Sequence, residues 1–304
     1  MSASAALDQD LFGHDIAARR AAVKSRLAAV RLSEPLPDAQ LRVLSLGVGL
    51  QSVVLAFMSA RGDLPPLDAA IFSDTGDEKR ATYDYLDYLR ERVPFPIIVT
   101  RRPGLTLGQH AVKIATSAVT RTCSPPWHTA EPDGMLPKQC NSEFKKRPIQ
   151  REIARLVREA TGKQRPPHTP IVEQWFGMTT DELWRMASNE RRYIHNRYPL
   201  TELGLARRDC VPWLERRQLR IPPKSSCKYC PFQRDDQWLD MKLNHPEDFA
   251  DAVALDYAIR PGFHGMQGRA YAHRARRPLD EIEFDPSPGQ GRVDFGCGEG
   301  ICGS

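Results

Sequence analysis

Three short apolar segments alternate with two helical patterns between residues 41 and 100. The apolar segments are rich in Val, Ile, Leu and Phe, which is typical of strands buried on both faces. Strand–helix alternation of this kind implies parallel strands joined by right-handed crossovers. The sequence therefore predicts an α/β fold built on a doubly wound parallel sheet. The predicted strands span residues 41–46, 67–72 and 95–100, and the predicted helices span residues 53–61 and 82–92.

The rest of the chain is predicted to be mainly helical, with one further strand at residues 173–177. A helix at residues 180–190 is expected to begin at Thr180, because a threonine hydroxyl is a good N-cap. The other predicted helices span residues 16–30, 147–160, 209–217, 235–243 and 246–259. The expected domains are an N-terminal helical extension (1–40), a nucleotide-binding α/β domain (41–205) and a helical, cysteine-containing C-terminal segment (206–304).

The composition narrows the class of protein. Of 304 residues, 41% are hydrophobic and 27% are charged, which excludes wholesale disorder and collagen-like repeats. The longest apolar run, residues 53–58, is far shorter than the ~20 residues of a membrane span, and the N-terminus does not resemble a secretory signal. The seven cysteines are an odd number, which favours a metal or redox role over a disulfide framework. We expect a cytoplasmic protein with no membrane partner.

A glycine-containing segment, Ser45-Leu46-Gly47-Val48-Gly49-Leu50-Gln51-Ser52, joins the first predicted strand to the first predicted helix. Glycines permit a tight turn in which several N–H groups face one anion, and the helix directs its positive end to the same place. Doubly wound sheets bind ligands at this point. We therefore expect a phosphate, pyrophosphate or sulfate group there, and a plain strand–helix turn is the alternative. The expected contacts are Ser45, Gly47, Gly49, Gln51 and Ser52.

This segment resembles the PP-loop of the ATP pyrophosphatases and the phosphoadenosine phosphosulfate reductases. The run Ser73-Asp74-Thr75-Gly76-Asp77-Glu78 is similar to a "DTG…ET" segment of those reductases, and Gly177, Asp181-Glu182 and Arg185 are similar to their "G-R…ES…R" region. The resemblance covers residues 41–235 and implies an adenine nucleotide alpha hydrolase-like fold, in a branch common in phage and actinobacterial sequences. It also implies that the nucleotide contacts Asp74, Thr75, Gly76 and Arg185.

The loop departs from the ATP-cleaving members of that superfamily, which carry Ser-Gly-Gly-x-Asp-Ser. Gly47 and Val48 stand at the first two positions, and Gln51 replaces the aspartate. In those enzymes the aspartate supports the geometry of metal and phosphate. Asp74 or Asp77 is therefore the expected source of a carboxylate for Mg²⁺.

The cysteines indicate a metal centre. Cys227 and Cys230 place two thiolates on one tight turn, where they can share a metal. Cys140 and Lys145 resemble the reductases' cluster cysteine and the lysine that meets their anionic substrate, so the resemblance implies a [4Fe–4S] cluster on three thiolates. Cys302 is a candidate for the fourth ligand, because the glycines beside it allow the tail to fold back. Zinc is the alternative metal, and the other cysteines are expected to be structural thiols (Cys123, Cys210 and Cys297).

The resemblance implies two enzymatic functions. In the first, ATP adenylates an oxygen of a tRNA, DNA or small-molecule acceptor. Pyrophosphate leaves with help from Mg²⁺ at Asp74 and from Lys145, and sulfur from a donor partner, carried by the cluster or by Cys302, displaces AMP. In the second, Cys302 attacks the sulfur of adenylyl sulfate or phosphoadenylyl sulfate, and a thioredoxin-like reductant resolves the thiosulfonate. The third alternative is not an enzyme. It is a nucleic-acid-binding module whose structure is stabilised by bound zinc and which has no catalytic activity.

The sequence does not name the acceptor, and it leaves open whether the chain forms a homodimer.

Four tryptophans are expected in the core rather than on base-stacking surfaces, since large aromatic side chains are usually buried. These are Trp175, Trp184, Trp213 and Trp238.

Overall fold

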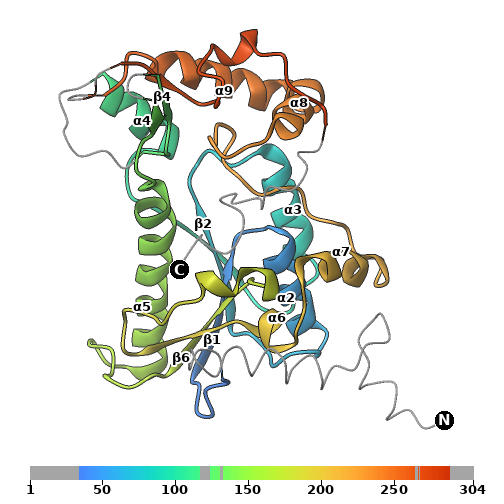
Figure 1. Ribbon diagram of the computed structural model, residues 1–304. Coiled ribbons are helices and arrows are strands. Elements are labelled where there is room, and N and C mark those ends of the chain that lie inside the picture. Colours follow the sequence, from blue (N-terminus) through green and yellow to red (C-terminus); the bar gives the residue numbers. More distant parts are fainter. Residues whose placement is uncertain (1–33, 117–123, 131–132, 264–265, 267, 288–304) are drawn as a thin grey trace.

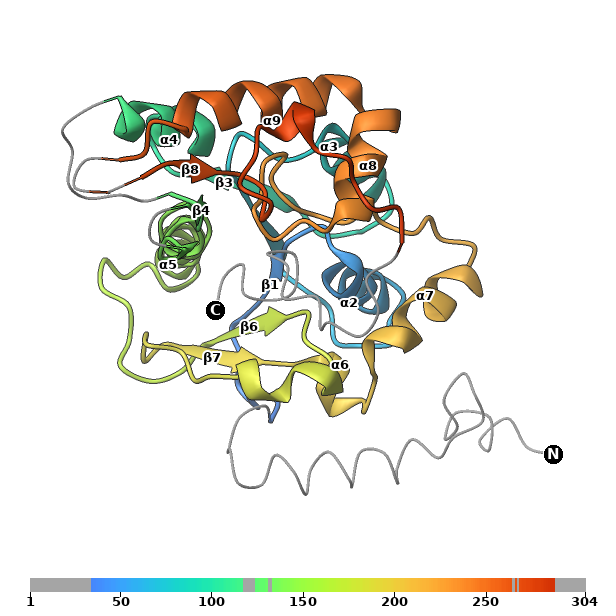
Figure 2. The ribbon, with the colours of Figure 1, turned by 45° about the horizontal axis from the view of Figure 1, so that its top comes forward.

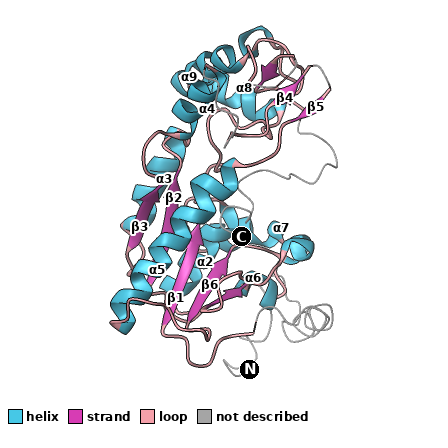
Figure 3. Ribbon diagram, turned by 90° about the vertical axis from the view of Figure 1, so that its left-hand side faces the viewer, coloured by secondary structure: helices cyan, strands magenta, loops and turns pink. Residues whose placement is uncertain are grey.

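The computed structural model describes residues 34–287 except 117–123, 131–132, 264–265 and 267. A five-stranded sheet flanked by helices forms the main layer, and a second group of helices lies beyond one end of it (Figures 1 and 3). The helix predicted at residues 16–30 lies outside the described residues. No helix in the described part of the chain has the length and apolar character needed to cross a membrane.

The main sheet is entirely parallel, with the strand order β3-β2-β1-β6-β7. The order of the strands reverses at the boundary between β1 and β6, and such sheets bind ligands at the carboxyl ends of the strands at this switch point. The four predicted strands are confirmed to within two residues at each end, whereas β7 was not predicted. The strands are β1 (Leu41–Leu46), β2 (Ala69–Asp74), β3 (Ile97–Arg101), β6 (Val172–Phe176) and β7 (Ile194–Arg197).

Helices cover both faces of this sheet, which confirms the doubly wound architecture. Side chains alternate between the two faces along a strand, so Leu44 and Phe72 enter one core while Val43 and Ile71 enter the other. Each fully buried aliphatic side chain contributes about 1.5–3 kcal/mol. The first core is covered by α2 (Leu50–Ala60), α3 (Arg80–Arg90) and α7 (Arg207–Glu215), and the second by α5 (Arg147–Thr161).

A smaller unit, which we call the cap, has its own apolar core. In it α9 lies against α4, with β8 and β4 nearby (Figure 2). Its core joins residues 107–144 to residues 227–284, so both sides of the predicted domain boundary at residue 205 contribute to it. The cap consists of α4 (Leu107–Ala115), α8 (Asp235–Asn244), α9 (Pro246–Ile259) and a small antiparallel sheet of β4 (His128–Thr129), β5 (Gly134–Met135) and β8 (Ala270–Tyr271).

The region after β6 differs from the prediction. Residues 180–190 do not form one helix capped by Thr180. The chain instead forms a 3-10 helix, η2 (Thr180–Arg185), whose N-cap is Thr179. Glu182 has a non-helical φ of −124°, and its buried carboxylate accepts a hydrogen bond from Gln51 (2.6 Å). This contact with a distant residue accompanies the break in the helix that the local pattern favours.

One of the four tryptophans is not a core residue. Trp184, on η2, is 65% exposed, which corrects the expectation for this position, whereas Trp175, Trp213 and Trp238 are buried as expected. Because η2 ends at the next residue, the side chain of Trp184 has no helical neighbours further along the chain to cover it. The remaining short elements are a π-helix, η1 (Ser142–Lys146), α6 (Pro199–Glu202) and η3 (Leu279–Glu281).

Three histidines give the fold an expected pH dependence. Burial lowers the pKa of His110, His128 and His273 below the usual 6.5. Folding thus favours neutral imidazole, so the stability these groups contribute is present above pH 6.5 and is lost as the pH falls through their folded pKa values. The free energy of unfolding should fall by at most about 1.4 kcal/mol per pH unit for each histidine.

Urea unfolding at about pH 7.5 and about pH 5.5 measures this slope. The variant His273→Asn should show a shallower slope, because it removes one of the buried titrating groups. An unchanged slope in this variant would contradict a contribution from His273.

Candidate functional site

The loop between β1 and α2 lies at the switch point of the sheet. Val48 has a φ of 56°, a left-handed conformation that β-branched residues rarely adopt, and its side chain is fully buried. Gly49 is the N-cap of α2, and the first turn of this helix contains no acidic residue. The hydroxyl of Ser52 donates to the carbonyl of Gly49 (3.0 Å). The positive end of α2 is therefore not neutralised by a side chain of its own first turn.

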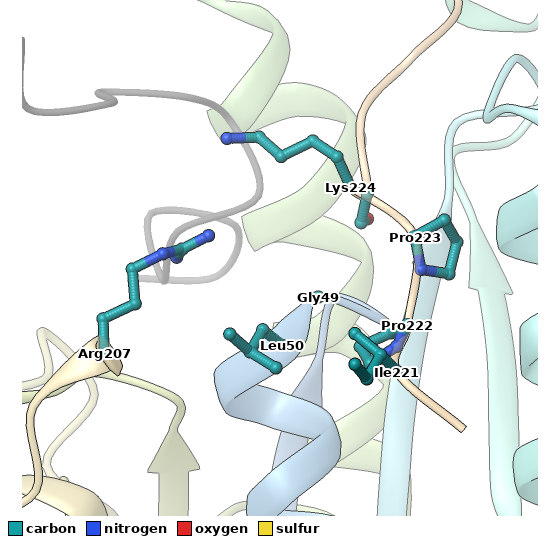
Figure 4. Close-up of a pocket in the computed structure, with 8 residues that line it drawn as sticks. Gly49, Leu50, Arg207, Ile221, Pro222, Pro223 and Lys224 are labelled. Atoms are coloured by element: carbon teal, nitrogen blue, oxygen red, sulfur yellow. The ribbon is translucent and has the colours of Figure 1, made fainter. Parts of the chain in front are cut away.

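A pocket of about 130 Å³ opens at this loop (Figure 4). Arg207, at the start of α7, and Lys224 extend their side chains toward it from two directions. The hydroxyl of Ser225 donates to the carbonyl of Gly47 and fastens the pocket wall to the loop. A helix N-terminus with two cationic side chains favours a phosphate or sulfate group. The apolar part of the lining is Leu50, Ile221, Pro222 and Pro223.

Sequence reasoning did not single out Arg207 or Lys224. They are two of 43 basic residues, and no local pattern distinguishes them from the others. They line the same pocket because α7 and the segment after residue 220 pack beside the start of α2.

Gln51 connects the first turn of α2 to its neighbours. Its amide nitrogen donates to Glu182 (2.6 Å), and its amide oxygen accepts from Arg207 (3.0 Å). Glu182 also forms an ion pair with Arg185, and both of these side chains are buried. Gln51 was predicted to face the phosphate, and in the structure it orients Arg207 at the pocket. Arg185 was predicted to contact the nucleotide, and in the structure it pairs with Glu182.

Gly177, directly after β6, contacts the start of α2 too closely for any side chain. A Cβ at this position would lie 2.6 Å from the backbone nitrogen of Ser52 and 2.9 Å from the carbonyl carbon of Gln51. A Cβ at Gly47 would meet no atom within 4 Å. The packing of the fold therefore requires glycine at 177 and not at 47. Ser45 lies in β1, where its buried hydroxyl accepts from the amide of Gln174 (2.7 Å).

Asp74, at the end of β2, holds the following loop together. Its Oδ1 accepts hydrogen bonds from the amide of Gly76 (2.7 Å) and the hydroxyl of Tyr83 (2.8 Å), and its Oδ2 accepts from Nε of Arg101 (2.8 Å). Asp77 accepts a backbone hydrogen bond from the first turn of α4 (2.8 Å). Protein donors thus contact both oxygens of Asp74 and Oδ2 of Asp77. A Mg²⁺ site at these carboxylates stays a prediction.

A buried ion pair lies next to this loop. Nζ of Lys145 is 3.3 Å from Oε1 of Glu78, and the two side chains are 8% and 0% exposed. The hydroxyl of Thr75 donates to the same carboxylate oxygen (3.1 Å). Sγ of Cys227 lies 3.5 Å from Oγ1 of Thr75 and 3.8 Å from Oε1 of Glu78. Lys145, predicted to meet an anionic substrate, thus faces a carboxylate of the protein. Glu78 belongs to the segment that resembles the reductases, but sequence reasoning gave it no role of its own.

The π-helix η1 positions Lys145. The carbonyl of Phe144, in the same turn, accepts a hydrogen bond from the hydroxyl of Ser73 (2.7 Å), which ties η1 to the end of β2. Single π-helical turns are rare in proteins, and many of those that occur lie at functional sites. The sequence does not predict this turn, because its register depends on the contact with β2.

The described cysteines assigned to a metal are all buried. Cys140 and Cys227 belong to the core of the cap, and the amide of Cys230 donates to the carbonyl of Cys227 (3.1 Å), which closes the predicted tight turn. In the described part of the chain, no group of three or more His, Cys, Asp or Glu side chains is arranged to hold a metal ion. The described thiols by themselves therefore do not fit the predicted cluster or the alternative zinc site. Cys302 lies outside the described residues.

Of the three cysteines expected to be structural thiols, the structure describes Cys210. Cys210 lies in the core between α2 and α7, and burial raises the pKa of its thiol to about 12. This agrees with the expected structural role. Cys123 and Cys297 lie outside the described residues.

Comparison with known proteins gives distant structural likenesses. No family model and no curated protein matches the chain. A phosphoadenylyl-sulfate reductase from Candida auris, solved as a phosphate complex, has a TM-score of 0.40 and 16% identity, and the match covers 67% of this chain and 81% of that one. The U34-tRNA thiolase NcsA from Methanococcus maripaludis, solved with its [4Fe–4S] cluster, has a TM-score of 0.38 and 12% identity, with 91% and 84% covered.

Both structural neighbours are distant from this chain in sequence, at 16% and 12% identity. Because both TM-scores are below 0.5, the assignment of the fold depends on the strand order and the packing described above. The phage and actinobacterial branch stays a prediction.

Proposed function

We propose that this chain is an enzyme that binds an adenine nucleotide by its phosphates at the start of α2 and carries out sulfur transfer beside it. One observation carries the proposal: Lys224 lines the pocket, and the buried thiol of Cys227 lies on the same segment three residues later. Three residues span at most about 11 Å between Cα atoms. A phosphate group at the pocket and sulfur chemistry at the cap would therefore be neighbours.

The proposed reaction is ATP-dependent thiolation. A carbonyl oxygen of a nucleic-acid or small-molecule acceptor forms a bond to the α-phosphorus of ATP, and the bond to pyrophosphate breaks. Arg207, Lys224 and the amides at the start of α2 would stabilise the charge on the leaving pyrophosphate. Sulfur at the oxidation level of sulfide, supplied by a donor partner, then bonds to the activated carbon, and AMP leaves with the oxygen.

Reduction of adenylyl sulfate or phosphoadenylyl sulfate is the second candidate function. It is favoured by the first turn of α2, which has no carboxylate and whose Gln51 is bonded to Glu182 and Arg207. The Cys302 thiolate would attack sulfur and break its bond to the nucleotide, giving a thiosulfonate. A dithiol reductant would then release sulfite and become a disulfide.

The [4Fe–4S] cluster at Cys140, Cys227, Cys230 and Cys302 stays a prediction, with zinc as the alternative. Thiolate-bound iron gives a brown protein that absorbs near ~400 nm. Anaerobic purification followed by metal analysis therefore distinguishes the two. Colourless protein with bound zinc and no turnover would support the non-catalytic nucleic-acid-binding module.

A panel of nucleotides tests the proposal. The full chain is incubated anaerobically with ATP, sulfide and a pool of tRNA or DNA, and in parallel with each sulfonucleotide and a dithiol. Pyrophosphate release supports thiolation, and sulfite release supports reduction. Arg207→Met should reduce the observed activity about tenfold or more.

The matched control is Arg208→Met, because the side chain of Arg208 is 81% exposed on the same helix. This variant should retain the activity of the unmodified chain. A chain that binds no adenine nucleotide and releases neither product would refute the proposed function.

A further inference from the structure

The loop after β2 and the segment before α8 run antiparallel beside each other. An isolated β-bridge joins Glu78 to Cys227. The neighbouring pair is joined as well, since the amide of Lys228 donates a hydrogen bond to the carbonyl of Asp77 (3.0 Å). Continuing this register by one residue sets Lys79 opposite Ser226. Side chains alternate along paired extended segments, so Glu78 and Cys227 share one side, where they contact each other, and Lys79 and Ser226 share the other.

Lys79 is buried, and its ammonium group has no hydrogen bond or ion pair with any residue that the structure describes. The whole residue is 8% exposed. Burial is the main cause that lowers the pKa of Lys79. Cys230 and two aspartates, one on α8 and one on α9, oppose this shift, and Lys224 adds to it. The aspartate on α9, Asp248, is already bonded to the side chain of Arg80 (2.6 Å). The cationic charge of Lys79 is therefore poorly compensated.

Ser226, on the opposite segment, is in a similar position. The residue is 3% exposed, and its Oγ is buried without a hydrogen-bond partner among the described residues. A buried polar group without a partner costs about 1–3 kcal/mol, and a charged group costs more. The unsatisfied hydroxyl of Ser226 and the poorly compensated charge of the buried residue Lys79, in opposed positions, indicate a ligand that would bond to both.

We infer that Lys79 and Ser226 form a binding subsite for a tetrahedral oxyanion, that is, a phosphate or sulfate group. An ammonium group and a hydroxyl donor together match the acceptor oxygens of such an anion. Ser226 directly follows Ser225, which lines the pocket at the start of α2, so the subsite adjoins that pocket. Lys224 lines the pocket, and its positive charge also acts on Lys79.

The ligand is either a second anionic group of the nucleotide held at the start of α2 or a separate inorganic anion. The choice between these two ligands rests on the proposed function. The subsite itself rests only on the burial of Lys79 and Ser226 and on their opposed positions. Both ligands present the same chemistry to the subsite.

Thermal unfolding of the full chain with sodium sulfate or sodium phosphate, at ionic strength matched with sodium chloride, tests the inference. Both anions should raise the melting temperature of the unmodified chain. Lys79→Met should bind sulfate about 10- to 100-fold more weakly, because a charge-assisted hydrogen bond is lost. Its melting temperature without anion should stay the same or rise, because a poorly compensated buried charge is removed.

Two further variants complete the test. Ser226→Ala should weaken sulfate binding about fivefold, with no loss of stability in the absence of anion. Lys163→Met is the matched control, since this lysine is exposed in the loop after α5, and its response to sulfate should be unchanged. An unmodified chain that neither anion stabilises, or a Lys79→Met variant with an undiminished response, overturns the inference.

Adding ADP identifies the source of the anion. If ADP abolishes the effect of sulfate, the subsite takes a phosphate group of the nucleotide. If ADP and sulfate stabilise the chain additively, it takes a separate anion. If sulfate binds and no adenine nucleotide does, the proposed function fails while the subsite stands.

Discussion

Replacing Glu78 by glutamine is expected to lower the free energy of unfolding by about 3–5 kcal/mol, the usual cost of removing one partner of a buried ion pair. Nζ of Lys145 lies 3.3 Å from the Glu78 carboxylate, and neither side chain is more than 8% exposed. Glutamine preserves the shape of the side chain but removes the charge that compensates the buried ammonium group. Urea unfolding followed by tryptophan fluorescence measures the change.

The matched control is the ion pair formed by the next residue. Nζ of Lys146 lies 2.8 Å from Glu190, but the two side chains are 24% and 76% exposed. Glu190→Gln should barely change the unfolding curve, because water already screens an exposed pair. Equal losses for Glu78→Gln and Glu190→Gln would contradict the burial of the Glu78 pair.

A double variant separates pairing from packing. If Glu78 and Lys145 stabilise each other, Glu78→Gln combined with Lys145→Met should be less destabilised than the sum of the two single variants. The loss in the Glu78 variant should also weaken nucleotide binding, since Glu78 bridges to the segment that carries Lys224 and Ser225. Simple additivity of the two changes would indicate that the contact contributes no coupling energy.

Gly177→Ala is expected to weaken nucleotide binding about tenfold or more and to lower the free energy of unfolding by about 1–3 kcal/mol. The added Cβ would lie 2.6 Å from the nitrogen of Ser52 and 2.9 Å from the carbonyl carbon of Gln51. Both are backbone atoms, which cannot rotate away as the end of a side chain can. The first turn of α2 must therefore shift, and its amides lose their alignment toward the pocket. Calorimetric titration with ATP and urea unfolding measure the two effects.

Two other glycines provide the controls. At Gly134 the nearest atom to an added Cβ is Oγ1 of Thr129 at 3.6 Å, an ordinary contact, so Gly134→Ala should leave binding unchanged. At Gly47 no atom lies within 4 Å, so Gly47→Ala should fold normally and weaken binding only through contact with the ligand. A Gly177→Ala variant that binds ATP like the unmodified chain would show that α2 tolerates the shift.

The parts of the fold that the sequence predicted are those encoded by neighbouring residues. The apolar runs of β1, β2, β3 and β6 have the length and composition of buried strands, and they were located to within two residues. The failures occur where a distant contact overrides the local pattern. The predicted helix at residues 180–190 is shortened to η2, where Glu182 bonds to Gln51, 131 residues away.

The candidate site shows the same division. The sequence located the glycine turn and the loop after β2, but it gave Asp74 and Lys145 roles toward a ligand. In the structure Asp74 bonds to Arg101 and Tyr83, and Lys145 pairs with Glu78. Whether a charged side chain faces a ligand or another residue depends on which partners the packing brings within about 4 Å, and residue type alone does not specify these partners.

The sequence by itself determined the parallel α/β sheet and the glycine turn at its switch point, because hydrophobic periodicity and turn chemistry act between residues close in the chain. Only the tertiary structure decided which charges surround the pocket and which polar groups stay unsatisfied. Cys227 meets Glu78 across 149 positions, and Arg207 meets Gln51 across 156. The first contact joins the loop after β2 to the segment that leads into the cap, and the second joins α7 to α2 beside the sheet. Contacts over such separations form only when these elements pack together, and no local pattern predicts them.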